Sequence, residues 1–174
     1  GFPTLRMGVN LSGRQFQKTD FTAVLDQVLE ETGIAPTTLE LEITETVAAQ
    51  DIEHTIMTLV DCKTRNIRLA IDDFGTGHSS LSYLKNFPFD RLKIDREFVR
   101  DIPQNADDAK MAETIITMGG NLGLEVIAEG VETEEQVDFL RRKGCTEMQG
   151  FHLARPMPAE KVLEILKEKG CTRP

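Results

Sequence analysis

The strongest constraint on the fold is an alternation of short apolar stretches with amphipathic helical patterns along the whole chain. A strand, a helix and a further strand in succession are typical of a parallel sheet with helical connections. The apolar stretches predict six strands, which cover residues 7–11, 39–43, 68–72, 91–94, 125–128 and 146–149. This alternation leaves two architectures open: a doubly wound open sheet or a closed barrel.

The helices between the strands are indicated by apolar side chains at helical spacing and by their end signals. Residues 21–29 and 52–60 each carry an apolar stripe of the i, i+3, i+4, i+7 type. Thr133 and Gln136 have the spacing of a capping box, and Gly144 stands where that helix should stop.

The order of polar and apolar residues within the strands favours the barrel. Glu40 and Glu42 alternate with apolar neighbours in the second stretch, and Arg91 and Lys93 do so in the fourth. Strands of an open sheet with helices on both faces tend to be apolar throughout. A polar face on several strands suits a barrel interior, so we expect a (β/α)8 TIM-like barrel. About six βα units fall short of the eight that close such a barrel, so we expect it to be incomplete.

Length, charge and residue composition limit the number of domains, the kinds of partner and the cellular location that we expect. The chain has 174 residues, of which 40% are hydrophobic, and we expect a single partial domain over residues 1–174. The net charge of −9 argues against DNA as a partner. No apolar run approaches the length of a membrane-spanning helix, so we expect no membrane contact by this segment. The three scattered cysteines indicate a reduced, cytoplasmic protein in which they fill the core.

Polar side chains stand at or near the end of every predicted strand. Since the carboxyl ends of barrel strands converge on one mouth, these side chains should meet there. Carboxylate and amide oxygens are the ligands that Mg²⁺ and Mn²⁺ prefer, and a gathered set of carboxylates needs a cation. The adjacent carboxylates of Asp72 and Asp73 can hold two metal ions, which suits phosphodiester hydrolysis. Lys93 adds a positive charge for the phosphate or the attacking water. The residues are Asn10, Glu42, Asp72 with Asp73, Lys93 with Asp95, Glu129, and Gln149.

Each of these residues also has an ordinary structural explanation. Strand-end Asp, Asn and Glu frequently cap helices or begin turns, and a lone lysine is usually a solvated surface residue. For any one residue this explanation is the simpler one, whereas six strand ends of compatible chemistry favour a shared site. Glu45 is either a further ligand or a residue that ties down neighbouring backbone, and we favour the second role.

Six motifs, in their order and spacing, resemble the EAL domain family over essentially the whole chain. They are Val9-Asn10-Leu11-Ser12, Leu41-Glu42-Ile43-Thr44-Glu45-Thr46, Ile71-Asp72-Asp73-Phe74-Gly75-Thr76-Gly77, Leu92-Lys93-Ile94-Asp95, Ala128-Glu129-Gly130-Val131-Glu132 and Gln149-Gly150-Phe151. The resemblance implies a modified (β/α)8 barrel that hydrolyses cyclic di-GMP to linear pGpG with Mg²⁺ or Mn²⁺ in a two-metal site.

The resemblance also implies roles for single residues. Metal binding falls to Asn10, Glu42, Asp72, Asp73 and Asp95. The catalytic group comprises Lys93, which holds the catalytic water, Glu129, and Glu45, which steadies the loop after Asp73. Gln149 is implied to bind substrate. The loop through His78-Ser79-Ser80 resembles a segment that couples dimerisation to activity, so we expect a homodimer or a strand-exchanged partner chain.

One departure from the family pattern leaves two functions open. The family's Glu-Ala-Leu motif carries a metal-binding glutamate on a strand ahead of the Asn10 strand, and the triplet does not occur in this sequence. The chain is therefore either the larger part of a phosphodiesterase, weak or inactive alone, or an inactive module that binds cyclic di-GMP or mediates interaction and dimerisation. An enolase-like barrel would also use magnesium, carboxylates and a lysine, but the motif set argues against it.

Overall fold

In the computed structural model, which describes residues 5–18, 20–75 and 84–168, six parallel strands lie side by side in chain order. They are β1 (Met7–Asn10), β2 (Leu39–Thr44), β3 (Arg68–Phe74), β4 (Arg91–Ile94), β5 (Glu125–Ala128) and β6 (Glu147–Met148). All six predicted strands are confirmed. β3 runs on to Phe74, beyond its predicted end, and β6 is the shortest.

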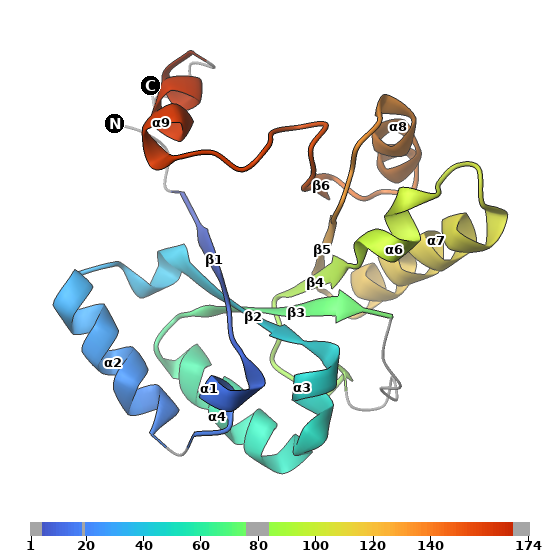
Figure 1. Ribbon diagram of the computed structural model, residues 1–174. Helices are drawn as coiled ribbons and strands as arrows, with labels where there is room; N and C mark the ends of the chain where they lie inside the picture. The colour runs from blue at the N-terminus through green and yellow to red at the C-terminus, as the bar shows by residue number, and fades with distance from the viewer. Residues whose placement is uncertain (1–4, 19, 76–83, 169–174) are drawn as a thin grey trace.

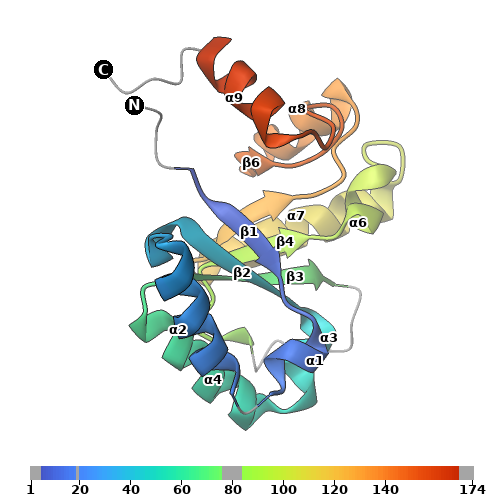
Figure 2. The same ribbon diagram turned by 60° about the vertical axis from the view of Figure 1, so that its left-hand side comes forward.

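Helices connect the strands and cover the outside of the curved sheet, and a last helix, α9, follows β6 (Figure 1). They are α1 (Gly13–Phe16), α2 (Phe21–Thr32), η1 (Pro36–Thr38), α3 (Glu45–Gln50), α4 (Ile52–Thr64), α6 (Arg96–Arg100), α7 (Ala106–Asn121), α8 (Glu134–Arg142) and α9 (Ala159–Glu168). The predicted capping box of Thr133 and Gln136 begins α8, and this helix ends just before Gly144, which has a φ of 90°. Figure 2 shows α9 on the side of the molecule where β1 begins.

The strands curl into a half-barrel with β1 and β6 at its two edges (Figures 1 and 2). The predicted alternation is confirmed, because Ile43, Leu69 and Leu92 are fully buried in the core between sheet and helices. The polar residues of the same strands line the concave side, where Glu40 and Lys93 share one cavity. The structure is therefore an incomplete barrel, in agreement with the predicted fold class.

Two expectations from composition and periodicity can be compared with the packing. Cys62 and Cys145 are free and buried, as predicted, while Cys171 lies outside the described residues. The apolar stripe of α2 is only partly buried: Leu25 packs in the core, but Val24 and Val28 are exposed, because only one side of the stripe faces the core. Within the described ranges, no helix is long and apolar enough to cross a membrane.

Candidate functional site

The register of the parallel strands brings the predicted polar residues to one end of the half-barrel. Asn10 lies level with Glu42 in the pairing of β1 with β2. Ile94 pairs with Ala128, so Asp95 and Glu129 both follow immediately at the same end. Since all strands run in one direction, their carboxyl ends form a single mouth.

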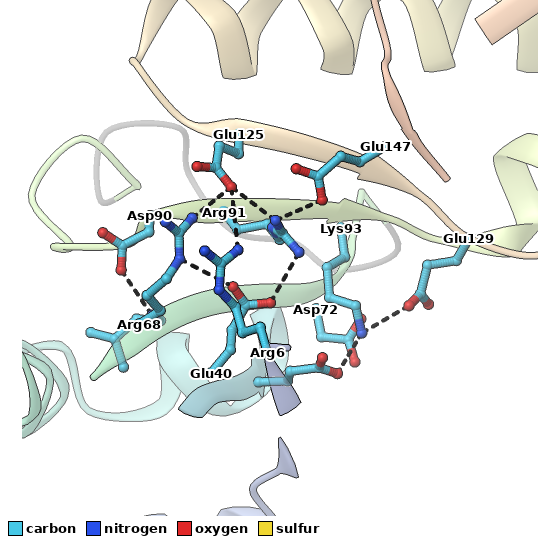
Figure 3. Close-up of polar contacts among 12 residues, drawn as sticks. Arg6, Glu40, Arg68, Asp72, Asp90, Arg91, Lys93, Glu125, Glu129 and Glu147 are labelled. Carbon is cyan, nitrogen blue, oxygen red and sulfur yellow. Dashed lines mark hydrogen bonds and ion pairs between the residues drawn. The ribbon is translucent and has the colours of Figure 1, made fainter. Parts of the chain in front are cut away.

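Lys93 is the centre of this mouth, where three carboxylates converge on its ammonium group (Figure 3). Its Nζ lies 2.5 Å from Glu42 Oε2, 3.0 Å from Asp72 Oδ1 and 2.8 Å from Glu129 Oε1. The lysine is 4% exposed, so these contacts are made largely out of water. Residues from β2, β3, β4 and the end of β5 thereby meet at one point, although they lie far apart in sequence.

A break in the regular geometry of β3 places Asp73 beside Asp72. The pairing of β3 with β4 shifts register between Ile71 and Phe74, and Asp73 has a φ of 52°. In a regular strand, consecutive side chains point to opposite faces. Here carboxylate oxygens of Asp72, Asp73 and Glu129 lie within 4.8 Å of one another.

The crowding of negative charge alters the acidity of the site. Burial raises the pKa of Asp73 to about 6, with a hydrogen bond to Asp95 and the charge of Asp72 acting in the same direction. Burial also raises the pKa of Glu129, against the lowering effect of its hydrogen bond to Lys93. Burial alone would lower the pKa of Lys93, but the surrounding carboxylates outweigh it and raise the pKa. Lys93 therefore remains an ammonium group at neutral pH.

Two further predicted residues contact backbone amides. Glu45 is buried at the start of α3, and its Oε2 accepts a hydrogen bond of 2.9 Å from the N–H of Gly75. It thus reaches the chain just after Asp73. Asp95 is the N-cap of α6 and accepts a hydrogen bond of 2.6 Å from the N–H of Glu97, so it combines capping with its contact to Asp73.

Asn10 and Gln149 lie at the two edges of the mouth. Asn10 ends β1 and is exposed. Gln149 follows β6, with its N–H donating to Ala128 O at 2.8 Å and its carbonyl accepting from Val131 N–H at 3.0 Å. Gln149 shares with Lys93 a cavity of about 150 Å³ inside the half-barrel. Residues 76–83, which include the loop segment His78-Ser79-Ser80, lie outside the described residues.

The donor chemistry of this mouth fits a divalent metal ion. Three carboxylates contact Lys93, and Asp73 and Asp95 lie beside this group, so among these described residues negative charge is in excess. Carboxylate oxygens at these separations are hard ligands of the kind that Mg²⁺ and Mn²⁺ prefer. Burial is the main cause of the raised pKa values of Asp73 and Glu129, and the charge of neighbouring carboxylates adds to it. A cation would relieve this repulsion.

Sequence reasoning missed a second charged cluster, which lies further down the barrel interior (Figure 3). Arg91 pairs there with Glu125 at 2.8 Å and Glu147 at 2.7 Å, and Arg68 pairs with Glu125 at 2.6 Å. The alternation of side chains along a strand could have indicated it, because residues two apart point to the same face. Arg91 and Glu40 therefore share the inward face with Lys93 and Glu42. We call Glu40, Arg68, Arg91, Glu125 and Glu147 the arginine belt.

Comparison with known proteins identifies proteins that are similar to this chain. A family model described as the EAL domain matches residues 1–156. The cyclic di-GMP phosphodiesterase NbdA of Pseudomonas aeruginosa is 41% identical over 167 residues, which are 96% of this chain and 21% of the relative. The chain thus spans about a fifth to a quarter of the curated relatives that it matches.

Solved structures show the same fold. The MucR phosphodiesterase in complex with c-di-GMP, from Pseudomonas aeruginosa, superposes with a TM-score of 0.87 and 42% identity, covering 90% of this chain and 64% of the other. The manganese and cyclic di-GMP complex of BlrP1 from Klebsiella pneumoniae superposes with a TM-score of 0.81 and 32% identity, covering 88% and 39%.

Proposed function

Because the chain belongs to the EAL domain family, we propose that it is the larger part of a phosphodiesterase domain that hydrolyses cyclic di-GMP to linear pGpG. The observation that carries this proposal is the convergence of Glu42, Asp72 and Glu129 on the ammonium of Lys93 at the carboxyl ends of adjacent strands. The substrate is supported by NbdA, a cyclic di-GMP phosphodiesterase, and by the cyclic di-GMP complexes of MucR and BlrP1.

We infer that the domain uses Mg²⁺ or Mn²⁺. The residues that would hold the metal are Asn10, Glu42, Asp72, Asp73 and Asp95, and Glu129 lies close enough to join them. When bound, two such ions supply Lewis acidity and lower the pKa of water. The BlrP1 structures include complexes with manganese and with calcium, which supports a divalent cation site.

The chain's own residues then divide the reaction between them. A water oxygen forms a new bond to phosphorus while one P–O ester bond breaks, so the water loses a proton and the leaving oxygen gains one. Lys93 stays protonated and therefore cannot act as the base; it orients the water and stabilises charge that develops on the phosphate. Glu129, beside Lys93 and with a raised pKa, is the carboxylate suited to accept the proton.

The remaining residues position the substrate and the loop. Gln149 lines the cavity next to Lys93 and can hydrogen-bond the dinucleotide. Glu45 holds the backbone after Asp73 through its bond to Gly75 N–H. The free, buried thiols of Cys62 and Cys145 support a cytoplasmic location for this domain.

A second candidate function is favoured by one feature of the sequence. The Glu-Ala-Leu triplet of the family does not occur in it. Without the glutamate of that motif the chain would hold metal more weakly. It would then bind cyclic di-GMP without turnover, or act in interaction and dimerisation.

One assay separates the two functions: the conversion of cyclic di-GMP to pGpG by the purified 174-residue chain with Mg²⁺ or Mn²⁺. We expect low activity that Asp72→Ala abolishes, because Asp72 contacts Lys93 and lies within 4.8 Å of carboxylate oxygens of Asp73 and Glu129. Asp138→Ala, at an exposed position of α8, should leave the activity unchanged. Binding of cyclic di-GMP without any Asp72-dependent pGpG would instead support the non-catalytic module.

A further inference from the structure

The loop between Glu129 and α8 is held closely by the segment that carries Gln149. Val131 N–H donates to Gln149 O, and His152 N–H donates to Val131 O, each at 3.0 Å. A Cβ atom on Gly150 would lie 2.1 Å from Val131 O, so only glycine allows the two backbones to approach this closely. One side of the Glu129 loop is thereby fixed.

The other side of the same loop is held by the side chain of Gln136, which is 3% exposed. Its Oε1 accepts hydrogen bonds from Glu132 N–H at 2.7 Å and Thr133 N–H at 3.0 Å. Its Nε2 donates to Val99 O at 3.1 Å and to Arg100 O at 2.9 Å. The carbonyls of Val99 and Arg100 belong to the end of α6, the helix that Asp95 begins.

These four hydrogen bonds exceed what a helix cap requires. In a capping box, the Gln136 side chain needs to accept only from Thr133 N–H, while the Thr133 hydroxyl accepts from Gln136 N–H. The two bonds from Nε2 cross to another element and reach the carbonyls of Val99 and Arg100 at the end of α6. An amide of this length carries donor and acceptor together, so neither Glu nor Leu can make all four contacts.

We propose that Gln136 is a positioning residue of the candidate site, which holds Glu129 in place relative to Lys93 and Asp95. The amide of Glu129 donates to Ile94 O at 3.1 Å, so its backbone lies directly beside the Lys93 strand. Gln136 secures the loop that follows, and Gly130 packs within that loop against Arg96, where a Cβ atom would lie 2.5 Å from Arg96 Cβ. This inference rests on the proposed function, because it assigns Glu129 to the metal and water site.

The test compares variants by their affinity for Mn²⁺, measured by electron paramagnetic resonance of the free ion. Gln136→Leu removes all four side-chain hydrogen bonds. Gln136→Glu replaces Nε2, which donates to two carbonyls, with a carboxylate oxygen that can only accept. We expect each to weaken Mn²⁺ binding about tenfold, as is usual for residues that orient metal ligands. Thr133→Ala is the matched control, because it breaks the other half of the same capping box, the bond from Gln136 N–H, and leaves the link to α6 intact. We expect less than about a twofold change for it.

Amide hydrogen exchange in EDTA gives a second measurement that does not depend on metal or on turnover. Loosening of the loop should speed exchange at Val131 about tenfold in Gln136→Leu, well beyond any effect of Thr133→Ala. If wild type shows no Asp72-dependent Mn²⁺ binding, the proposed function fails and exchange alone decides the role of Gln136. Equal effects of Gln136→Leu and Thr133→Ala would overturn the positioning role. Gln136→Asn, whose amide is one methylene too short, replaces Gln136→Leu if that variant does not fold.

Discussion

Two adjacent aspartates reach the same mouth because the backbone changes conformation between them. Asp73 adopts a positive φ of 52°, and Asp72 Oδ1 accepts a hydrogen bond of 3.0 Å from the N–H of Asp73. Residues other than glycine seldom adopt this conformation, although Asp and Asn tolerate it best. The arrangement brings both carboxylates together, which is unfavourable unless a proton or a cation intervenes.

Asp73 should make the metal-free protein less stable as pH rises. Its pKa is raised from 3.8 to about 6, so between these values the folded protein binds more protons than the unfolded chain. Stability contributed by the protonated group is present below about pH 4 and is lost as pH rises through about 6. Asp73→Asn cannot ionise and keeps a side chain suited to positive φ. We expect its free energy of unfolding in EDTA, relative to wild type, to increase between about pH 4 and pH 7.

Urea unfolding at these two pH values provides the measurement. Asp138→Asn, at an exposed position, should show no such change between the two pH values. A difference between Asp73→Asn and wild type that stays constant with pH would contradict the expectation. Asp73→Asn should also weaken Mn²⁺ binding, because the residue contributes to the acidic group with Asp72 and Glu129.

At the scale of the elements, the arginine belt joins five strands of the half-barrel, β2 to β6. Arg91 of β4 contacts Glu40 of β2, Glu125 of β5 and Glu147 of β6 at 3.3, 2.8 and 2.7 Å. Glu40 is 3% exposed, and its Oε2 lies 3.4 Å from Arg68 Nε in an ion pair without hydrogen-bond geometry. The arginines of the belt therefore compensate the buried charge of Glu40 on the concave side of the sheet. The helices that connect the strands pack against the convex side (Figure 1).

Arg91→Met should strongly destabilise the fold. Removal of one partner from a buried ionic network leaves charge in excess and costs up to about 3–5 kcal/mol. Here Glu40 would keep only its ion pair of 3.4 Å with Arg68. The free energy of unfolding in urea measures this cost. Replacing Glu40 by Gln in the same chain should recover part of it. Arg100→Met is the control, since Arg100 pairs with Asp101 at the surface, and we expect no significant change in the free energy of unfolding. A loss below about 1 kcal/mol for Arg91→Met would show that the belt is not a significant source of stability.

At the scale of the whole molecule, the two edges of the half-barrel differ from its centre in exposure. Met7 and Val9 of β1 are 61% and 39% exposed, whereas every residue of β4 is buried. Among the described residues, β1 and β6 each pair with one strand only. Unpaired strand edges with apolar side chains are templates for pairing with another chain.

The isolated chain should therefore associate with itself through β1. We expect sedimentation velocity to show a concentration-dependent dimer, and Val9→Lys to shift it toward monomer, since edge lysines oppose strand pairing. Val28→Lys places the same charge on an exposed position of α2, away from the edge, and should leave association unchanged. A wild-type chain that stays monomeric at all concentrations would refute this expectation.

The sequence alone determined the strands, the capping box of α8 and the inward polar face, because these depend on the spacing of side chains over a few neighbours. It also placed Glu42, Asp72, Lys93 and Glu129 at strand ends, from which their convergence followed by the geometry of parallel strands. Only the tertiary structure decided the turn of Asp73 into the mouth, the contacts of Gln136 with α6 and the pairing within the arginine belt. These depend on register and on distances between elements remote in sequence, which local spacing does not encode.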